Sequence, residues 1–179
     1  MRPVNGPIGL AAIMTAQLFS PAHIIAVDVA TNRLEAAKRF GADVAIDARR
    51  GDAEVDAAVL ALTAGLGADV VFEAVGTPET FEACTRLVRP GGHVANIGVH
   101  GAAATLHLES LWIKNVTITT GLVDTFSTPT FLRLLAGQQL DATPFATHHF
   151  TLDEFLAAYV VFTRAAETGA LKVVLTRAT

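Results

Sequence analysis

Short apolar runs alternate with longer, mixed segments along the first hundred positions of the chain. The runs are rich in Val, Ile and Ala, as in parallel strands buried on both faces, and cover 23–28, 44–46, 68–73 and 93–99. The segments between them predict helices over 7–19, 32–40, 52–64 and 78–88. Strands that alternate with helices at this interval need right-handed crossovers, so the pattern predicts an α/β fold with a doubly wound parallel sheet.

Local signals mark the ends of these elements, and the rhythm changes after Gly101. We expect Asn32 to cap its helix and Pro90-Gly91-Gly92 to separate a helix from the next strand. Further along, the pattern predicts a helix near 109–114, a strand over 116–120, helices over 129–136 and 153–166, and a closing strand over 172–176. No linker interrupts the chain, so one domain over 1–179 is expected.

Composition excludes several classes of partner. The 179 residues are 51% hydrophobic and 17% charged, with a formal net charge of −4 and no run of basic residues. Nucleic acids and anionic membrane surfaces both require a basic footprint, so neither is expected as a partner. The apolar stretch 8–19 is too short to span a bilayer and is interpreted as a buried helix. A single cysteine, Cys84, permits no internal disulfide and no cysteine-rich zinc site, and it indicates a reducing cytoplasm.

The strongest local motif is a glycine turn that opens the first helix. Gly6-Pro7-Ile8-Gly9 is followed by Asp28, 22 positions after Gly6, at the end of the next strand. In a dinucleotide-binding fold such a turn brings backbone amides to a pyrophosphate, and the acidic residue binds the adenosine ribose. A carboxylate there would repel a 2′-phosphate, which favours NAD over NADP. The alternative is a tight turn followed by a surface aspartate.

The motif is incomplete at its start. Its first glycine would fall at Val4, and the strand that normally precedes it is reduced to Met1-Arg2-Pro3. The first strand is central in the usual strand order of this fold. We therefore expect a Rossmann-type sheet truncated at its first strand, with either a gap beside the strand 23–28 or a contact there from another segment.

Several blocks in a fixed order make the resemblance to a known family specific. They are Gly6-Pro7-Ile8-Gly9-Leu10, Asp28 with Asn32-Arg33-Leu34, Gly41-Ala42-Asp43, the run from Gly67 to Gly76, Arg89-Pro90-Gly91-Gly92, Asn96-Ile97-Gly98-Val99, the run from Ile118 to Val123, and the run from Ala170 to Leu175. Together they resemble the C-terminal NAD-binding domain of zinc-containing medium-chain alcohol dehydrogenases. The resemblance covers nearly the whole chain and does not include that family's N-terminal zinc-binding catalytic domain.

The resemblance implies a set of cofactor contacts. Gly6, Pro7, Ile8 and Gly9 would line the pyrophosphate, and Asp28 and Arg33 would hold the adenosine ribose. Val75, Gly76, Ile97, Gly98, Val99, Gly121, Leu122 and Val123 would present mainly backbone to the nicotinamide side, while Lys172 would approach the pyrophosphate. For Arg33 and Lys172 a solvated side chain without a cofactor contact stays an open alternative.

The resemblance also implies where the chemistry is carried. In the family a zinc ion polarises the alcohol oxygen and permits hydride transfer to NAD, and its thiolate and imidazole ligands belong to the other domain. We therefore expect no catalytic residue and no metal ligand here, and an inactive isolated chain. The adjacent His148 and His149 are poorly placed for joint ligation. His23, His93, His100 and His107 are expected to be surface or satisfied core histidines.

The implied partners are NAD(H), a small alcohol or its aldehyde or ketone in the intact enzyme, and a second copy of the chain. The segment 104–120 contains Trp112 and a predicted edge strand, and an uncovered edge invites pairing, as in the dimers of the family. Packing of Trp112 within one subunit is the alternative. Two other functions stay open: an S-adenosylmethionine-dependent methyltransferase-like domain, which can share the glycine turn and Pro90-Gly91-Gly92, and an inactive structural remnant.

Overall fold

The computed structural model describes residues 6–121 and 125–177. The chain forms two compact units, Met1–Thr125 and Phe126–Thr179. The elements of the first unit are α1 (Pro7–Ala16), η1 (Gln17–Phe19), β1 (Ile25–Asp28), α2 (Thr31–Arg39), β2 (Val44–Asp47), η2 (Ala48–Arg50), α3 (Asp52–Leu62), β3 (Ala68–Glu73), α4 (Pro78–Leu87), β4 (Val88–Asn96), α5 (Leu108–Leu111) and β5 (Thr117–Thr120). The helix η3 (Thr125–Ser127) lies at the boundary between the units.

The strands of the first unit pair in parallel, as predicted. β1 pairs with β2, and β3, β4 and β5 form a second sheet in that order, which leaves β5 at an edge. Asp28 is in register with Asp47 in the first sheet, and Glu73 is in register with Asn96 in the second. Polar residues therefore end neighbouring strands at the carboxyl edge of each sheet.

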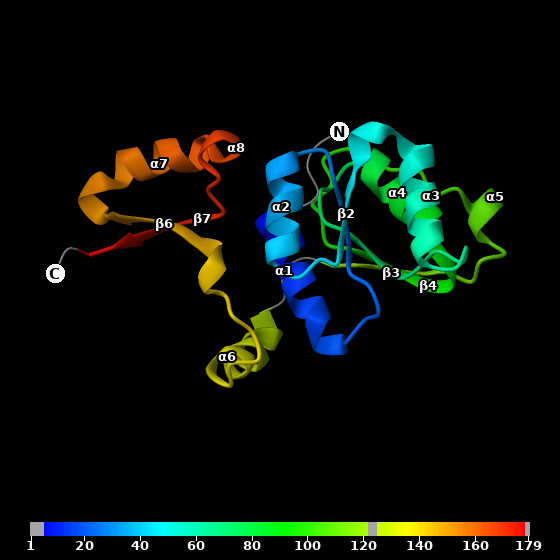
Figure 1. Cartoon of the computed structure of the whole chain (residues 1–179), viewed down its shortest axis with the longest axis horizontal. Coiled ribbons are helices and arrows are strands. Elements are labelled where there is room, and N and C mark those ends of the chain that lie inside the picture. The colour runs from blue at the N-terminus through cyan, green and yellow to red at the C-terminus, as the bar shows by residue number, and fades with distance from the viewer. Residues whose placement is uncertain (1–5, 122–124, 178–179) are drawn as a thin grey trace. The chain divides into compact units, whose positions relative to one another are not determined.

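Helices cover both faces, which confirms the doubly wound arrangement. In Figure 1, α1 and α2 lie on one side of β2 and α3 and α4 on the other. α2 packs on β1 and β2, whereas α4 packs on β3 and β4 and contacts α3. One buried cluster joins Ile46 to α3, and a second contains Cys84, Val88 and Val94. These clusters fix each sheet beneath its helices.

The described strands of the first unit form two separate sheets. Among the described residues β1 pairs with β2 alone and β3 with β4 alone, so the two sheets share no strand pair. The expected gap beside β1, or a contact there from another segment, stays a prediction. Residues 1–5, which include Val4, lie outside the described residues.

The start of α2 corrects the prediction that Asn32 caps this helix. The helix begins at Thr31, and its N-cap is Ala30, without a side-chain cap. Asp28 Oδ1 accepts a hydrogen bond from the Ala30 N–H at 2.9 Å. This short turn brings the chain into helical conformation earlier than a cap at Asn32 would.

The strand β4 also differs from its prediction. It extends from Val88 to Asn96, through the expected turn at 90–92, and ends before Ile97 rather than at Val99. The register with β3 shifts between Val88 and His93, so the intervening residues form a bulge. Gly91 has a φ of +70° and donates its N–H to the Lys114 carbonyl oxygen at 2.7 Å. A bulge tolerates Pro90, which has no N–H to offer a ladder.

The second unit contains one strand that the sequence pattern does not predict. Its elements are α6 (Thr128–Ala136), η4 (Thr143–Phe145), β6 (Ala146–Thr151), η5 (Leu152–Glu154), α7 (Phe155–Thr163), α8 (Ala165–Thr168) and β7 (Lys172–Thr176). β6 pairs in parallel with β7, and α7 packs on both. The polar sequence of β6, with its two histidines, conceals the strand. The helix predicted over 153–166 is divided into η5, α7 and α8, because the backbone departs from α-helical conformation at Glu154 and at Arg164.

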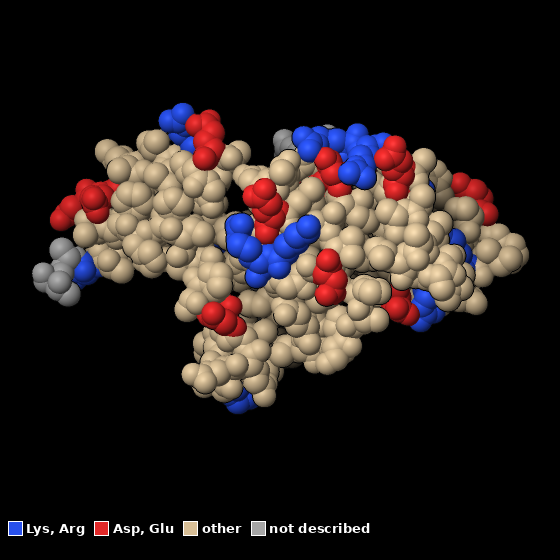
Figure 2. All heavy atoms as spheres, viewed as in Figure 1, with Lys and Arg blue, Asp and Glu red and all other residues tan. Residues whose placement is uncertain are grey.

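Of the helices in the described ranges, none has the length and apolar character needed to cross a membrane. On the face drawn in Figure 2, basic side chains lie beside acidic ones.

Candidate functional site

The glycine turn begins the helix α1. Gly6 is the extended N-cap and Pro7 is the first helical residue, and the first turn has no acidic residue and no side-chain cap. The first helical bond is donated by the Leu10 N–H to the Gly6 carbonyl oxygen at 3.0 Å. The N–H groups of Ile8 and Gly9 precede that bond and have no carbonyl partner within the helix. Ile8 is 54% exposed, so this positive helix end suits an anion that approaches from solvent.

Asp28 and Arg33 connect the end of β1 to this turn. Asp28 is fully buried. Arg33 lies on the first turn of α2, and its Nη1 atom is 3.7 Å from the place where a Cβ on Gly6 would stand. The structure therefore brings Arg33 to the glycine turn, while Asp28 holds the turn before α2. A cationic side chain and an uncapped helix end at one place fit the charge of a pyrophosphate.

A second polar centre lies at the end of β3, where Glu73 is 1% exposed. Its Oε1 atom accepts hydrogen bonds from the N–H groups of Val75 and Gly76, both at 2.9 Å, and from the Thr80 hydroxyl at 2.7 Å. The carboxylate thus fixes the turn that follows its own strand and connects it to α4.

Glu73 also holds the turn that follows β4. Its carbonyl oxygen accepts hydrogen bonds from the N–H groups of Ile97 at 2.8 Å and Gly98 at 3.0 Å. A Cβ on Gly98 would lie 2.3 Å from Glu73 Oε2 and 2.3 Å from the Gly76 nitrogen. Gly76 has a φ of +85°, and a Cβ there would lie 2.1 Å from the Val99 carbonyl oxygen. Only glycines permit this contact, so the structure brings together the residues predicted at 75–76 and 97–99.

Asn96 and His100 complete this buried cluster. The Asn96 amide donates to the Gly98 carbonyl oxygen at 3.3 Å, and its Oδ1 lies 2.8 Å from His100 Nε2. His100 Nε2 is also 3.3 Å from Glu73 Oε2. Within the described residues, neither Glu73 Oε2 nor His100 Nδ1 has a hydrogen-bond partner. His100 is therefore a partly buried histidine that is satisfied at Nε2 but not at Nδ1.

Sequence reasoning missed this cluster as a functional feature, although one signal was available. Glu73 and Asn96 each end an apolar strand, and parallel strands present such ends at one edge of a sheet. His100 and Thr80 carry no comparable signal, because only the folded chain brings them to Glu73.

Four further predicted cofactor contacts lie outside these two centres in the sequence. Gly121 is exposed just after β5, and Lys172 is exposed at the start of β7 in the second unit. Leu122 and Val123 lie outside the described residues. Their predicted roles stay predictions.

Within residues 6–121 and 125–177, no group of three or more His, Cys, Asp or Glu side chains is arranged to hold a metal ion. Cys84 lies on the buried face of α4, and burial raises the pKa of its thiol to about 12. Because metals bind the thiolate, this protonated thiol is a packing group.

Comparison with known proteins gives the class of protein to which this fold and turn belong. The model of the zinc-binding dehydrogenase family matches residues 7–136. An alcohol dehydrogenase from Cupriavidus necator is 34% identical over 175 residues, which are 96% of this chain and 47% of that protein.

Two solved structures have the same fold. The zinc-dependent alcohol dehydrogenase 2 of Streptococcus pneumonia is 42% identical with a TM-score of 0.90, over 98% of this chain and 50% of that one. A zinc-binding dehydrogenase from Sinorhizobium meliloti, bound to NADP, is 25% identical with a TM-score of 0.83, over 96% of this chain and 50% of that one.

The chain belongs to the zinc-binding dehydrogenase family, and its α/β fold is the Rossmann-like fold of alcohol dehydrogenases. It spans about half the length of the relatives that it matches. Membership in this family gives no support to the methyltransferase alternative.

Proposed function

We propose that residues 1–179 are the NAD(H)-binding part of an alcohol dehydrogenase that transfers hydride between a small alcohol and NAD. The observation that carries the proposal is the meeting of the uncapped start of α1 with Arg33 of α2, directly after the strand that ends at Asp28. A helix N-terminus and a guanidinium both favour a pyrophosphate, and a carboxylate at a strand end binds ribose hydroxyls.

In this proposal the chain supplies binding and orientation. NAD, when bound, accepts or supplies the hydride. Gly6, Pro7, Ile8 and Gly9 would hold the pyrophosphate, and the turns at 75–76 and 97–99 would present backbone groups to the nicotinamide end. Gly121 to Val123 and Lys172 would add further contacts. The zinc ion and its ligands would come from a separate domain, so the chain alone should bind cofactor without turning over an alcohol.

Asp28 favours NAD over NADP in this proposal. A 2′-phosphate at this position would face a carboxylate and be repelled, whereas two ribose hydroxyls would donate hydrogen bonds to it. The Sinorhizobium meliloti relative bound to NADP makes this choice of cofactor a point to measure. Because Asp28 is fully buried, ribose binding requires the groups that cover it to move aside.

A fluorescence titration tests the proposed function. NADH added to the 179-residue chain should show saturable binding, and NADPH should bind more weakly because of repulsion at Asp28. Absence of NADH binding at millimolar concentration would contradict the proposal and favour the inactive remnant. An alcohol and NAD supplied together should give no NADH, since the chain lacks a catalytic residue in this account.

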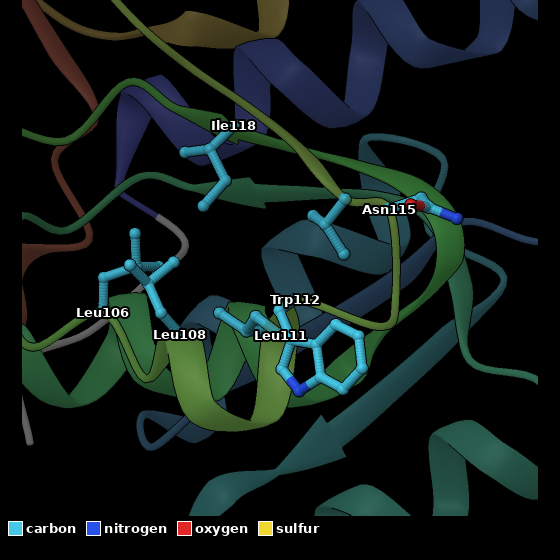
Figure 3. A pocket seen from close by; sticks show the side chains of 7 residues that line it. Leu106, Leu108, Leu111, Trp112, Asn115 and Ile118 are labelled. Carbon is cyan, nitrogen blue, oxygen red and sulfur yellow. The ribbon is translucent and has the colours of Figure 1, made fainter.

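We also propose that two copies of the chain associate along the segment 104–120. β5 has an unpaired edge among the described strands, and Trp112, Ile113 and Leu108 are 73%, 68% and 61% exposed. Beside them lies an open, mostly apolar hollow of about 320 Å³ (Figure 3), lined by Leu106, Leu108, Leu111, Trp112, Asn115, Val116 and Ile118. A strand edge next to exposed apolar groups favours a two-fold pair of strands.

Light scattering coupled to size-exclusion chromatography tests this association. The wild type should have the mass of a dimer, and Trp112→Asp should shift it to a monomer, because a carboxylate cannot be buried unpaired in an apolar contact. A Trp112→Asp variant that is still a dimer would favour packing of Trp112 within one subunit.

The proposal also places the protein in the cytoplasm, where the thiol of its single, buried Cys84 stays reduced.

A further inference from the structure

We propose that Glu73 and His100 are positioning residues that set the shape of the nicotinamide half of the cofactor site without touching the cofactor. The inference rests on the proposed function, because it assigns the turns at 75–76 and 97–99 to that half. It adds a division of the site: Asp28 and Arg33 serve the adenosine half, and a separate buried cluster serves the other.

Both turns depend on Glu73. Its side-chain Oε1 accepts the N–H groups of Val75 and Gly76, and its main-chain oxygen accepts those of Ile97 and Gly98. One residue therefore accepts four backbone N–H groups, two from the turn after β3 and two from the turn after β4. Any change in the orientation of the carboxylate moves the first turn against the second, since Gly76 and the Val99 carbonyl are in direct contact.

His100 sets the orientation of the carboxylate. Because the Asn96 amide nitrogen donates to Gly98, the Asn96 oxygen must accept, so His100 Nε2 carries the proton that points at this oxygen. The same nitrogen atom lies 3.3 Å from Glu73 Oε2, an oxygen that has no hydrogen-bond partner within the described residues. The Phe81 ring meets the His100 ring edge to face, with centroids 6.1 Å apart, and keeps the imidazole in place.

The burial of the cluster explains why it positions the turns rather than binds the ligand. The Glu73 side chain has no exposed surface, and its Oε1 already accepts three donors. In contrast, Val99 beside it is 74% exposed. A ligand can thus meet the backbone that the cluster holds but cannot reach the carboxylate.

The test compares NADH with ADP-ribose, which lacks the nicotinamide, by calorimetric titration of the full chain. Glu73→Gln keeps one acceptor oxygen but turns an amide NH₂ toward the His100 N–H, so two donors face each other. We expect the affinity for NADH to fall about tenfold, the loss typical of one hydrogen bond to a charged group, with ADP-ribose within about twofold of the wild type. Unfolding of the variant would instead lower the affinity for both ligands by the same factor.

Thr80→Val gives a second variant of nearly the same shape, and Thr85→Val is its matched control. Both threonines are buried on α4. The Thr80 hydroxyl donates to Glu73 and also accepts the Thr77 N–H in the capping box of this helix, whereas the Thr85 hydroxyl donates to the Glu82 carbonyl oxygen at 2.8 Å. Thr80→Val should lower the affinity for NADH about threefold, as the loss of a weaker hydrogen bond does, and leave the affinity for ADP-ribose unchanged. Thr85→Val should leave the ratio of the two affinities unchanged.

Three outcomes separate the claims. A lower NADH to ADP-ribose affinity ratio in Glu73→Gln and Thr80→Val, but not in Thr85→Val, supports the positioning role. An unchanged ratio in a folded Glu73→Gln or Thr80→Val variant overturns it and leaves the proposed function intact. Failure of the wild type to bind either ligand overturns the proposed function and this inference together.

Discussion

The ends of β2 and β3 use the same local hydrogen bond in two different surroundings. Asp47 Oδ1 accepts the N–H of Arg49, and Glu73 Oε1 accepts that of Val75, each two residues ahead and each at 2.9 Å. Asp47 is partly exposed and pairs with the exposed Arg49, whose side-chain hydrogen bond lowers the pKa of Asp47 to about 2. Glu73 is enclosed, and its Oε2 atom lies 3.3 Å from His100 Nε2.

The difference shows how burial turns a common turn into a constraint. Water can replace the contacts of Asp47, so the exposed ion pair contributes little. The Glu73 carboxylate is buried, so its contacts are costly to lose. Asp28, at the end of β1, makes the same turn with Ala30 and is as buried as Glu73. The ends of β1 and β3 are thus the buried ones.

The largest expected effect is on stability after removal of the buried carboxylate. Glu73→Ala leaves two backbone N–H groups and the Thr80 hydroxyl without their acceptor, which should destabilise the fold by about 3–5 kcal/mol. Urea unfolding followed by circular dichroism measures this change. Asp47→Ala is the comparison, and an equal loss in both variants would remove the distinction between the two strand ends.

The next effect comes from the close approach of the two turns. Gly98→Ala places a methyl group 2.3 Å from Glu73 Oε2 and from the Gly76 nitrogen, so overpacking should cost about 1–3 kcal/mol. Thermal unfolding gives the difference. The control is Gly101→Ala, since no atom lies within 4 Å of a Cβ there. A Gly98→Ala variant as stable as this control would show that the turns separate at little cost.

A smaller, selective effect is expected at Asp28. Asp28→Asn removes the charge that repels a 2′-phosphate and weakens acceptance of ribose hydroxyls, so the preference for NADH over NADPH should fall about tenfold. Parallel titrations with the two cofactors give this ratio. The assignment of Asp28 to the ribose fails if both affinities change by the same factor.

The smallest effect belongs to Asp47, and its dependence on pH has a definite sign. The pKa of this carboxyl is lowered from 3.8 to about 2 in the fold, so its stabilising contribution is present above pH 3.8 and disappears as the pH falls toward 2. The unfolding free energies of the wild type and of Asp47→Asn should therefore converge as the pH falls from about 4 to about 2, the range between the two pKa values. A difference that grows as the pH falls would contradict this assignment.

The sequence predicted the parts of the fold that follow from apolar periodicity. The strand 68–73 and the helix after it were found with their boundaries nearly correct, because a buried β-branched run and a Pro-led helix are local signals. β6 was missed because its histidines and threonines break the apolar pattern, and pairing with β7 overrides that local composition. The sequence predicted a turn at 90–92 where the structure has a bulge, because Pro and Gly are typical of both.

The candidate site divides in the same way. Gly6, Asp28 and Arg33 were predicted from spacing and resemblance, since their roles follow from backbone geometry near one turn. The contact of Glu73 with His100 joins residues that no motif connects, and it exists only because β3 and β4 end side by side.

Chemical-shift mapping of the isotopically labelled chain tests the central claim most directly. If the chain binds NAD at two centres, NADH should shift the amide signals of Gly6 and Ala30 at one centre and of Gly76 and Gly98 at the other. ADP-ribose should shift the signals of Gly6 and Ala30 alone. Shifts confined to other parts of the chain, or none at saturating NADH, would contradict the account.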